Sequence, residues 1–327
     1  MNQQAIRVLE LKQGYLFQKR SQRRLRVTVG PSMAVATHGR YEYSAINTRP
    51  TYEWPNGSKL AVYIALNIEQ FPFGEGLQHT LAHEAPHPDV ANYGWRDYGN
   101  RVGVWRLLDL FDELQLPVSV LLNSTVYEHC PGLAEAFIKR GDEIVGHGRT
   151  NGEKQGVLSE DEERALIEEA TMAHPKRPQG WLGPWLSQSF VTPDLLQDAG
   201  YTYVLDWCLD DQPVWMKTRN GGILAIPYAS EINDIPAIVV RREAHINFAD
   251  MIVDNFDEQL EQSRKGAPLV MAISLHPFIV GQPFRLRHLR RALQHICASR
   301  DKIWFTTAGA IAEHAAGLPK GTLPGDA

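Results

Sequence analysis

Apolar and polar positions form alternating blocks from residue 59 onward. Residues 60–67 are a nearly continuous apolar run, which predicts a strand buried on both faces. A polar segment rich in Gly and Pro follows, from residue 70 to about residue 92. Residues 98–115 are expected to be helical, because apolar side chains recur there at helical spacing. The members of this stripe are Val104, Leu107, Leu108, Phe111 and Leu114.

The same alternation continues towards the C-terminus. Further strands are expected at residues 117–122, 143–146, 179–183, 201–207, 223–227, 269–275 and 303–307. Further helices are expected at residues 133–140, 159–173, 247–263 and 285–298. A capping box of Ser159 and Glu162 marks the start of the second of these helices. Strands that alternate with helices predict a parallel sheet with helical crossovers.

The order of elements favours a single barrel over two domains. The chain has no glycine-rich phosphate fingerprint, which argues against a nucleotide-binding doubly wound sheet. We therefore expect an α/β fold, a distorted (β/α) barrel of about seven parallel strands over residues 41–320. In such a barrel the chemistry lies at the carboxyl ends of the strands. Residues 1–40 are expected to be a peripheral or disordered basic extension.

The N-terminal extension invites two further interpretations. The Arg23-Arg24 pair could mark an export signal, but the residues that follow are broken by Gly30 and Pro31 and lack an apolar core. Met33 is a second candidate for the start of the chain.

Composition and charge exclude several classes of protein. The chain has 33 basic and 38 acidic residues, a net charge of −5, and no basic stripe in its body, which argues against nucleic-acid binding. Its apolar runs are far shorter than the roughly 20 residues of a membrane helix. Three scattered cysteines without a CxxC pair predict neither a disulfide scaffold nor a cysteine zinc site, and they fit a reducing compartment such as the cytoplasm. A small-molecule substrate is the expected partner.

Polar residues follow several of the expected strands. They are Glu69, Gln70, His147, Trp181, Trp185, Asp206, Asp210, Asp211 and His276. Histidines and carboxylates on one rim are what general acid–base hydrolysis requires. Each residue also has a structural explanation, since a single histidine can bond to the backbone and adjacent carboxylates can cap a turn. Their joint occurrence at successive strand ends favours the functional interpretation.

A second group of histidines lies in the polar segment. His79, His83 and His87 are spaced by four, which on a helix would place them on one face for metal binding. Pro86 and Pro88 argue against a helix there, so an exposed polar loop is favoured.

From about residue 41 to residue 314 the order of motifs resembles the polysaccharide deacetylase (NodB-homology) superfamily, and within it most closely the branch of metal-independent allantoinases. The motifs are residues 98–106, Gly146-His147-Gly148, Gly180-Trp181, residues 206–213, residues 226–228 with Asn233-Asp234, and residues 275–277 with 281–285. The resemblance implies the barrel fold, hydrolysis of a non-peptide carbon–nitrogen bond and assembly as a homo-oligomer.

The metal motifs of the superfamily are altered in this chain. Where the metal-dependent deacetylases carry Thr-Phe-Asp-Asp, this chain has Asn67-Ile68-Glu69-Gln70, and their His-Ser-x-x-His reads His147 to Asn151. A catalytic zinc usually takes three protein ligands, and of the family set only His147 remains. We therefore predict no catalytic metal and no cofactor, although a residual site on Glu69 and His147 stays open.

The resemblance also implies roles for individual residues. Glu69 would be the general base, with its pKa raised by burial, and His276 would protonate the leaving nitrogen. Asp211, or its neighbour Asp210, would orient His276, and His147 would polarise the carbonyl or hold the substrate. Further substrate contacts are expected from Gln70, Asn151, Trp181, Trp185, Asp206, Asp210 and Arg285.

Two other functions remain as alternatives. One is a metal-dependent N-deacetylase of an acetylated sugar, and the other is a catalytically dead barrel that binds a ligand. The retention of both Glu69 and His276 favours an enzyme. The substrate stays open, because Asn151 and residues 183–185 differ from the allantoinase pattern.

Overall fold

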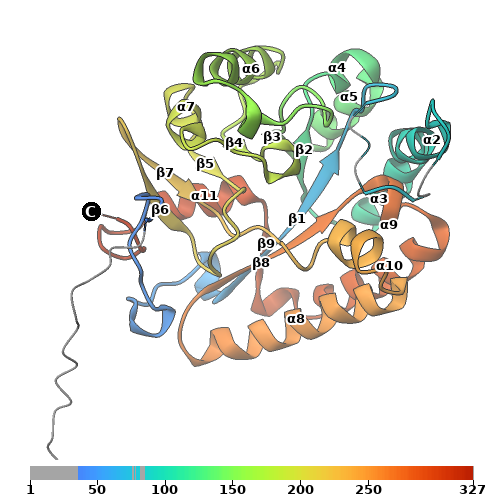
Figure 1. The fold of residues 1–327 in the computed structure, drawn as a ribbon. Coiled ribbons are helices and arrows are strands. Elements are labelled where there is room, and N and C mark those ends of the chain that lie inside the picture. The colour runs from blue at the N-terminus through green and yellow to red at the C-terminus, as the bar shows by residue number, and fades with distance from the viewer. Residues whose placement is uncertain (1–35, 76, 78, 82–84, 327) are drawn as a thin grey trace, which may run out of the picture. The chain divides into compact units, whose positions relative to one another are not determined.

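The computed structural model describes residues 36–75, 77, 79–81 and 85–326, and the centre of this part of the chain is a sheet of nine strands (Figure 1). The expected basic extension, apart from residues 36–40, and His83 lie outside the described residues. The strands are β1 Leu60–Ile68, β2 Ser119–Leu122, β3 Glu143–Gly146, β4 Gly180–Trp181, β5 Tyr203–Val204, β6 Val214–Thr218, β7 Gly221–Ala225, β8 Leu269–Leu275 and β9 Trp304–Thr306.

The sheet is built around β1, whose nine residues are all buried. β8 pairs in parallel with β1 from Leu60 to Leu66. β9 pairs with the first half of β1 and β2 with its second half, so these two strands share the other side of β1. The remaining strands continue outward from β2 in the order β3, β4, β5, β7 and β6. The continuous apolar run of β1 therefore occupies the middle of the sheet, as its composition predicts.

The pairing is parallel except between β6 and β7, which form an antiparallel hairpin. β6 is not among the strands expected from the sequence. The hydrogen-bonded sheet is not closed, and irregular chain lies along the free edge of β8. The main-chain nitrogen of Val270 donates to Asp211 O at 2.8 Å, and that of Ser274 donates to Ile232 O at 3.0 Å. The mostly parallel α/β fold is as predicted.

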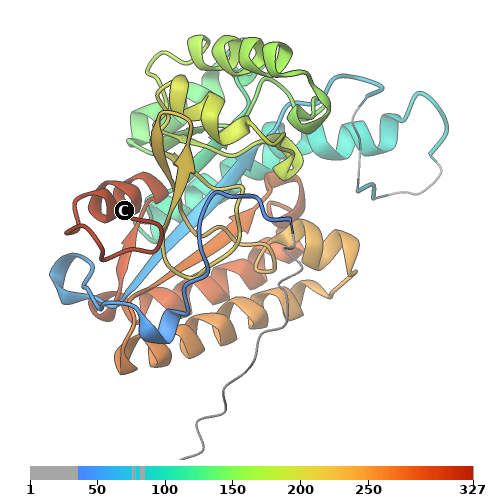
Figure 2. The same ribbon diagram turned by 60° about the vertical axis from the view of Figure 1, so that its left-hand side comes forward.

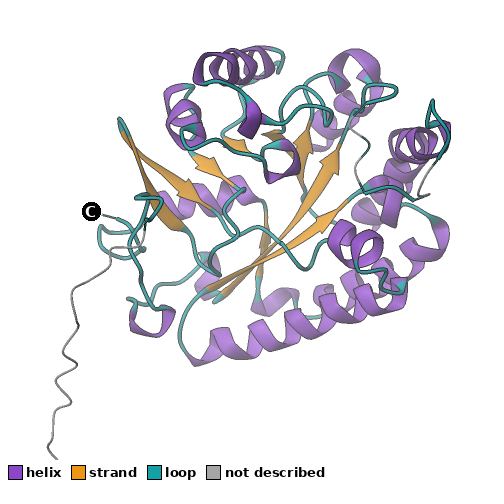
Figure 3. Cartoon of the chain, in the orientation of Figure 1, coloured by secondary structure: helices purple, strands orange, loops and turns teal. Residues whose placement is uncertain are grey.

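Helices surround the strands (Figure 3). They are α2 Val90–Tyr98, α3 Val104–Glu113, α4 Val126–His129, α5 Pro131–Arg140, α6 Glu160–Met172, α7 Thr192–Asp198, α8 His245–Lys265, α9 Pro277–Val280, α10 Pro283–Cys297 and α11 Ala308–Ala316. The long helices α8 and α10 lie side by side in two views (Figures 1 and 2). No helix in the described ranges is long and apolar enough to cross a membrane.

Alternate residues of β1 and β8 face two different apolar cores. Leu60, Val62 and Ile64 pack with residues of the outer helices α3, α8 and α10. Ala61 and Tyr63 pack instead with residues of β5, β7 and α11 inside the curved sheet. Because side chains alternate along a strand, the next odd-numbered positions beyond Tyr63 also point inward. Polar residues at those positions, near the end of the strand, therefore face the interior of the fold.

The helix expected to start at residue 98 begins eight residues earlier. Asp89 caps α2 by accepting a hydrogen bond from the main-chain nitrogen of Asn92 at 3.0 Å. The π-helical turn Gly99–Gly103 then joins α2 to α3. A Cβ atom at Gly103 would lie 2.2 Å from Pro277 O, so only glycine allows this turn to pack against the start of α9. This close contact fixes the chain immediately after β8.

Candidate active site

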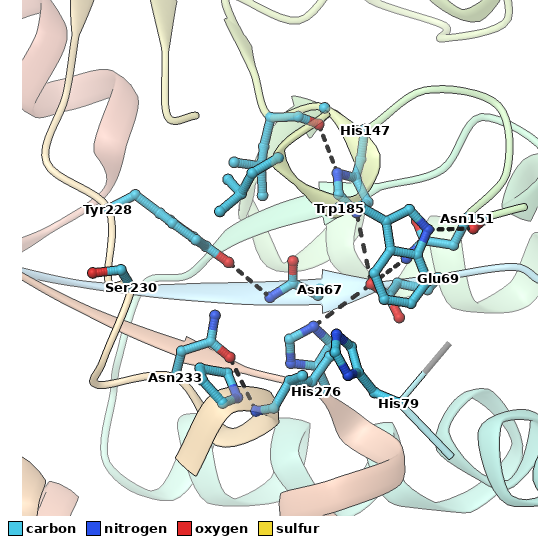
Figure 4. A pocket seen from close by; sticks show the side chains of 15 residues that line it. Asn67, Glu69, His79, His147, Asn151, Trp185, Tyr228, Ser230, Asn233 and His276 are labelled. Carbon is cyan, nitrogen blue, oxygen red and sulfur yellow. Dashed lines mark hydrogen bonds and ion pairs between the residues drawn. The ribbon is translucent and has the colours of Figure 1, made fainter. Parts of the chain in front are cut away.

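The carboxyl ends of β1, β3 and β8 meet at a pocket of about 270 Å³ (Figure 4). Most of the polar side chains in its lining come from residues that directly follow these strands or lie in the loop after β7. The lining residues are Asn67, Glu69, His79, His147, Asn151, Leu182, Gly183, Trp185, Leu186, Tyr228, Ser230, Asn233, Ile235, Pro236 and His276. The pocket therefore occupies the place where parallel α/β folds carry their chemistry.

Glu69, His147 and His276 point towards one another in this pocket (Figure 4). The Nε2 atom of His276 lies 3.5 Å from Glu69 Oε1, and the Nε2 atom of His147 lies 3.8 Å from the same oxygen. The three residues continue the inward-facing positions of β1, β3 and β8. The convergence expected from their places at the strand ends is what the structure shows.

His276 is held by a buried carboxylate that the sequence did not assign to this role. Asp234 Oδ1 lies 2.6 Å from His276 Nδ1, and Asp234 Oδ2 accepts a hydrogen bond of 2.8 Å from the main-chain nitrogen of His276. Burial alone would lower the pKa of His276, but the charges of Asp234 and Glu69 raise it to about 9. His276 is therefore an imidazolium at neutral pH, with Nε2 directed at Glu69.

His147 has a defined tautomer. Its Nδ1 atom lies 2.6 Å from the carbonyl oxygen of Leu182, and a carbonyl oxygen can only accept a hydrogen bond. The proton of a neutral His147 is therefore on Nδ1, and Nε2 is left as an acceptor that faces Glu69. The Nε2 atom has no hydrogen-bond partner among the residues that the structure describes.

Glu69 is 8% exposed and sits within a ring of donors. Asn151 Nδ2 donates to Glu69 Oε1, and Arg96 Nη1 lies 3.8 Å from Glu69 Oε2. Burial alone would raise the pKa of Glu69, but the charge of His276 and the hydrogen bond from His276 lower that pKa below its ordinary value. The expectation of a raised pKa is therefore wrong, because the imidazolium of His276 outweighs desolvation. Glu69 is ionised at neutral pH.

The expected contact between His276 and Asp211 or Asp210 is also wrong. Asp210 forms two hydrogen bonds of 2.6 and 2.7 Å with Arg49, and Asp211 Oδ1 accepts a long one of 3.4 Å from Gln259. The main chain of Asp211 pairs with the start of β8, whereas His276 follows its end. Six residues of extended strand separate these ends by about 20 Å.

The other expected substrate contacts divide into two groups. Asn151 and Trp185 line the pocket, and Trp185 Nε1 donates to Asn151 O at 2.7 Å. Gln70, Trp181, Asp206, Asp210 and Arg285 are not among the lining residues. Trp181 is fully buried and donates to Gln155, while Asp206 accepts a hydrogen bond of 2.8 Å from the main chain of Gly183. Asp206 therefore supports the pocket wall from behind.

Several residues of the site were not found from the sequence. They are Asn67, His79, Arg96, Tyr228, Ser230, Asn233 and Asp234. Tyr228 and the Asn233-Asp234 pair do stand within the motifs of the family resemblance, which was the available signal. His79 is exposed in a loop, as expected, and it also lies in the pocket lining, with its ring centroid 5.6 Å from that of Trp185.

The described donors do not fit the metal site of a deacetylase. No group of three His, Cys, Asp or Glu side chains in the described ranges is arranged to hold a metal ion. At the position of the second family histidine, Asn151 presents its amide nitrogen to Glu69, and a carboxamide N–H is a donor rather than a ligand. The side chains around Glu69 are thus arranged as a hydrogen-bonding network.

Comparisons with known proteins agree with this architecture. No family model matches the chain. A curated protein from Schizosaccharomyces pombe, described as a putative polysaccharide deacetylase, is 27% identical over 305 residues, which cover 82% of this chain and 92% of that protein. A peptidoglycan deacetylase from Helicobacter pylori is 21% identical over 64% of this chain and 82% of its own length.

Two solved structures share both the fold and part of the sequence. A probable polysaccharide deacetylase from Pseudomonas aeruginosa PAO1 superposes with a TM-score of 0.69 and 28% identity, covering 80% of this chain and 92% of that one. PuuE allantoinase superposes with a TM-score of 0.69 and 26% identity, covering 81% and 93%. These likenesses confirm the resemblance of the chain to polysaccharide deacetylases and to an allantoinase.

Proposed function

We propose that this protein hydrolyses a non-peptide carbon–nitrogen bond in a small uncharged amide, cyclic amide or ureide, without a catalytic metal. The observation that carries the proposal is the buried series Asp234, His276 and Glu69, in which an imidazolium and a carboxylate face each other at 3.5 Å. A charged base and a charged acid are then present together at neutral pH, as acid–base catalysis requires.

In the proposed reaction Glu69 removes a proton from a water molecule in the pocket. The water oxygen forms a bond with the carbonyl carbon of the substrate, and His276 Nε2 donates its proton to the nitrogen as the carbon–nitrogen bond breaks. Glu69 is then neutral and so is His276. A proton can return from Glu69 to His276 across the 3.5 Å that separates them, which restores both groups for the next turnover.

The remaining polar side chains position the reactants. Because Nε2 of His147 is an acceptor, it is suited to hold the second hydrogen of the water that Glu69 activates. This assignment replaces the expected polarisation of the carbonyl, which would need a donor at that atom. Asn151 fixes Oε1 of Glu69 and thereby the direction in which the base points.

The size and charge of the pocket support a small uncharged substrate. A volume of about 270 Å³ is below the roughly 300–1,000 Å³ of pockets that enclose drug-sized ligands. The carboxylates of Glu69 and Asp234 are matched by the cations of His276 and Arg96. A charged substrate would disturb this balance, whereas an uncharged amide would not.

The experiment is a turnover assay with the purified full chain on a panel of ureides, cyclic amides and N-acetylated amines, read by the release of ammonia, amine or acetate. Glu69→Gln should lower kcat by about 10²–10⁴-fold, because it removes the base and keeps the shape. Glu258→Gln, on the exposed face of α8, is the matched control and should leave kcat unchanged. Full activity of Glu69→Gln would refute the assignment, and binding without turnover would support a catalytically dead barrel.

A further inference from the structure

Two carboxamides lie in the pocket beside the catalytic groups. Asn67 is the inward-facing residue of β1 two positions before Glu69, and Asn233 forms a bridge with Ser274 on the free edge of β8. Both line the pocket, on the side where Tyr228 and Ser230 also lie (Figure 4). Neither side chain takes part in the proposed acid–base chemistry.

The orientation of Asn67 follows from its partners. Its side chain makes a hydrogen bond of 3.2 Å with the carbonyl oxygen of Leu275, which can only accept, so the atom that faces this carbonyl is Nδ2. The same nitrogen donates to Ser274 Oγ at 3.1 Å. Oδ1 of Asn67 therefore points the other way, into the pocket, as Figure 4 shows. No described residue donates a hydrogen bond to this oxygen.

The orientation of Asn233 is fixed by the opposite kind of partner. The main-chain nitrogen of Ile235, which can only donate, makes a hydrogen bond of 3.0 Å with Asn233 Oδ1. The other end of this side chain is therefore Nδ2, and one of its hydrogens is directed at Ala229 O over 3.4 Å. Figure 4 shows this nitrogen on the side facing Asn67. The second hydrogen of Nδ2 is left for a ligand.

We propose that Asn67 and Asn233 form a specificity site for an –NH–C(=O)– unit of the substrate other than the bond that is cleaved. Asn67 Oδ1 accepts the N–H, and Asn233 Nδ2 donates to the carbonyl oxygen. That the bound ligand is a substrate rests on the proposed function, whereas its recognition by the two carboxamides needs no turnover. Main-chain partners fix both amide orientations, so the site is built before the ligand arrives.

The site selects secondary amide units against N-alkylated ones. A methyl group on the recognised nitrogen removes the donor and leaves Asn67 Oδ1 desolvated without a partner, which is the strongest form of discrimination by a hydrogen-bonding site. An ester or ether analogue of similar size should be rejected for the same reason. An apolar ligand of equal volume would leave both carboxamides unpaired.

The test measures binding by calorimetry in the Glu69→Gln background, so that turnover does not enter. The probes are hydantoin, a cyclic ureide, and its 1-methyl and 3-methyl derivatives. Hydantoin should bind, and one methyl derivative should bind at least about tenfold more weakly. Asn67→Ala should lower the affinity for hydantoin about tenfold and abolish the preference over that derivative. The exposed Asn247→Ala on α8 should change neither affinity.

Two further variants separate recognition from folding. Asn67→Thr keeps a hydroxyl donor for Leu275 O but removes the oxygen in the pocket, so it should lose the same preference if Asn67→Ala does not fold. Asn233→Asp keeps the acceptor for Ile235 and replaces the donor, so hydantoin should bind at least about tenfold more weakly. Equal affinities for the three probes, a preference that survives these substitutions, or no saturable binding of hydantoin would overturn the inference, whether or not the parent protein turns over a substrate.

Discussion

Asp234 forms two hydrogen bonds with His276, one with the ring nitrogen Nδ1 at 2.6 Å and one with the main-chain nitrogen at 2.8 Å. The carboxylate thus fixes both the rotamer and the charge of the imidazole. Asp234→Asn should still hold the rotamer of His276 in part, but it should no longer stabilise the positive charge of the imidazole, because a carboxamide carries no charge. We expect kcat to fall by about 10²–10⁴-fold with a smaller change in KM.

The control for this substitution is Asp211→Asn. Asp211 is exposed and lies at the opposite end of β8, so its loss should leave kcat within about twofold of the parent value. A larger loss in Asp211→Asn than in Asp234→Asn would show that the histidine is oriented in a different way from the one described.

The activity should be nearly constant across neutral pH. His276 has a pKa raised to about 9, so its acidic form is present below that value and is lost as the pH rises through it. Glu69 has a lowered pKa, so its basic form is lost only at a pH below the ordinary range of a glutamate. A profile of kcat/KM should therefore fall on the alkaline side near pH 9. In Asp234→Asn that limb should move to lower pH, and an unchanged limb would exclude His276 as its source.

Metal removal should not affect turnover. The side chains around Glu69 are engaged in hydrogen bonds, and Asn151 presents a donor where a ligand would be needed. Prolonged dialysis against a chelator should leave kcat within about twofold of the untreated enzyme. The metal content of the same samples should be measured as well, to show that the chelator has removed any bound metal. Activity lost on chelation and restored by zinc would contradict the proposal.

The turn at Gly103 should be sensitive to a single methyl group. In Gly103→Ala the new Cβ would lie 2.2 Å from Pro277 O, so the π-helical turn and α9 must separate. We expect the free energy of unfolding to fall by about 1–3 kcal/mol. Because Pro277 follows His276, kcat should fall as well, and chemical denaturation with steady-state kinetics would measure both effects.

Gly132→Ala is the matched control. Gly132 lies in α5, and a Cβ there would meet nothing within 4 Å. Alanine also has the higher helix propensity, so this variant should be as stable as the parent or more stable by up to about 1 kcal/mol. Equal stability of the two variants would mean that the contact at Gly103 is looser than described.

The sequence predicts the centre of the fold better than its margins. Apart from Asn67 and Ser274 near their ends, β1 and β8 are apolar and buried on both faces, so their identity follows from composition alone. β6 alternates between buried and partly exposed residues at the edge of the sheet, and its short pattern does not stand out from a loop. The start of α2 was missed because Pro86 and Pro88 stand just before it and Gly94 lies inside it, and these residues are typical of a loop.

In the site, too, the sequence predicts some residues well and others not at all. Glu69, His147 and His276 could be placed because each follows a recognisable strand, and parallel strands end at one edge. Asp211 and Asp234 could not be told apart, because both lie in irregular chain beside β8 and only the main-chain pairing decides which end each one reaches. The direction of the pKa shift at Glu69 depends on the His276 imidazolium that folding brings close to it, and no linear pattern encodes this distance.

The proposed catalytic group is assembled from parts of the chain that are far apart. Glu69 stands at the end of the central strand, while His147, Asp234 and His276 come from positions 78, 165 and 207 residues further along. Each reaches the pocket only when its own segment is paired with the sheet. A chain in which any one of these segments is unpaired would therefore lack a member of the group, so turnover would report on the completeness of the sheet more directly than spectroscopic helix content does.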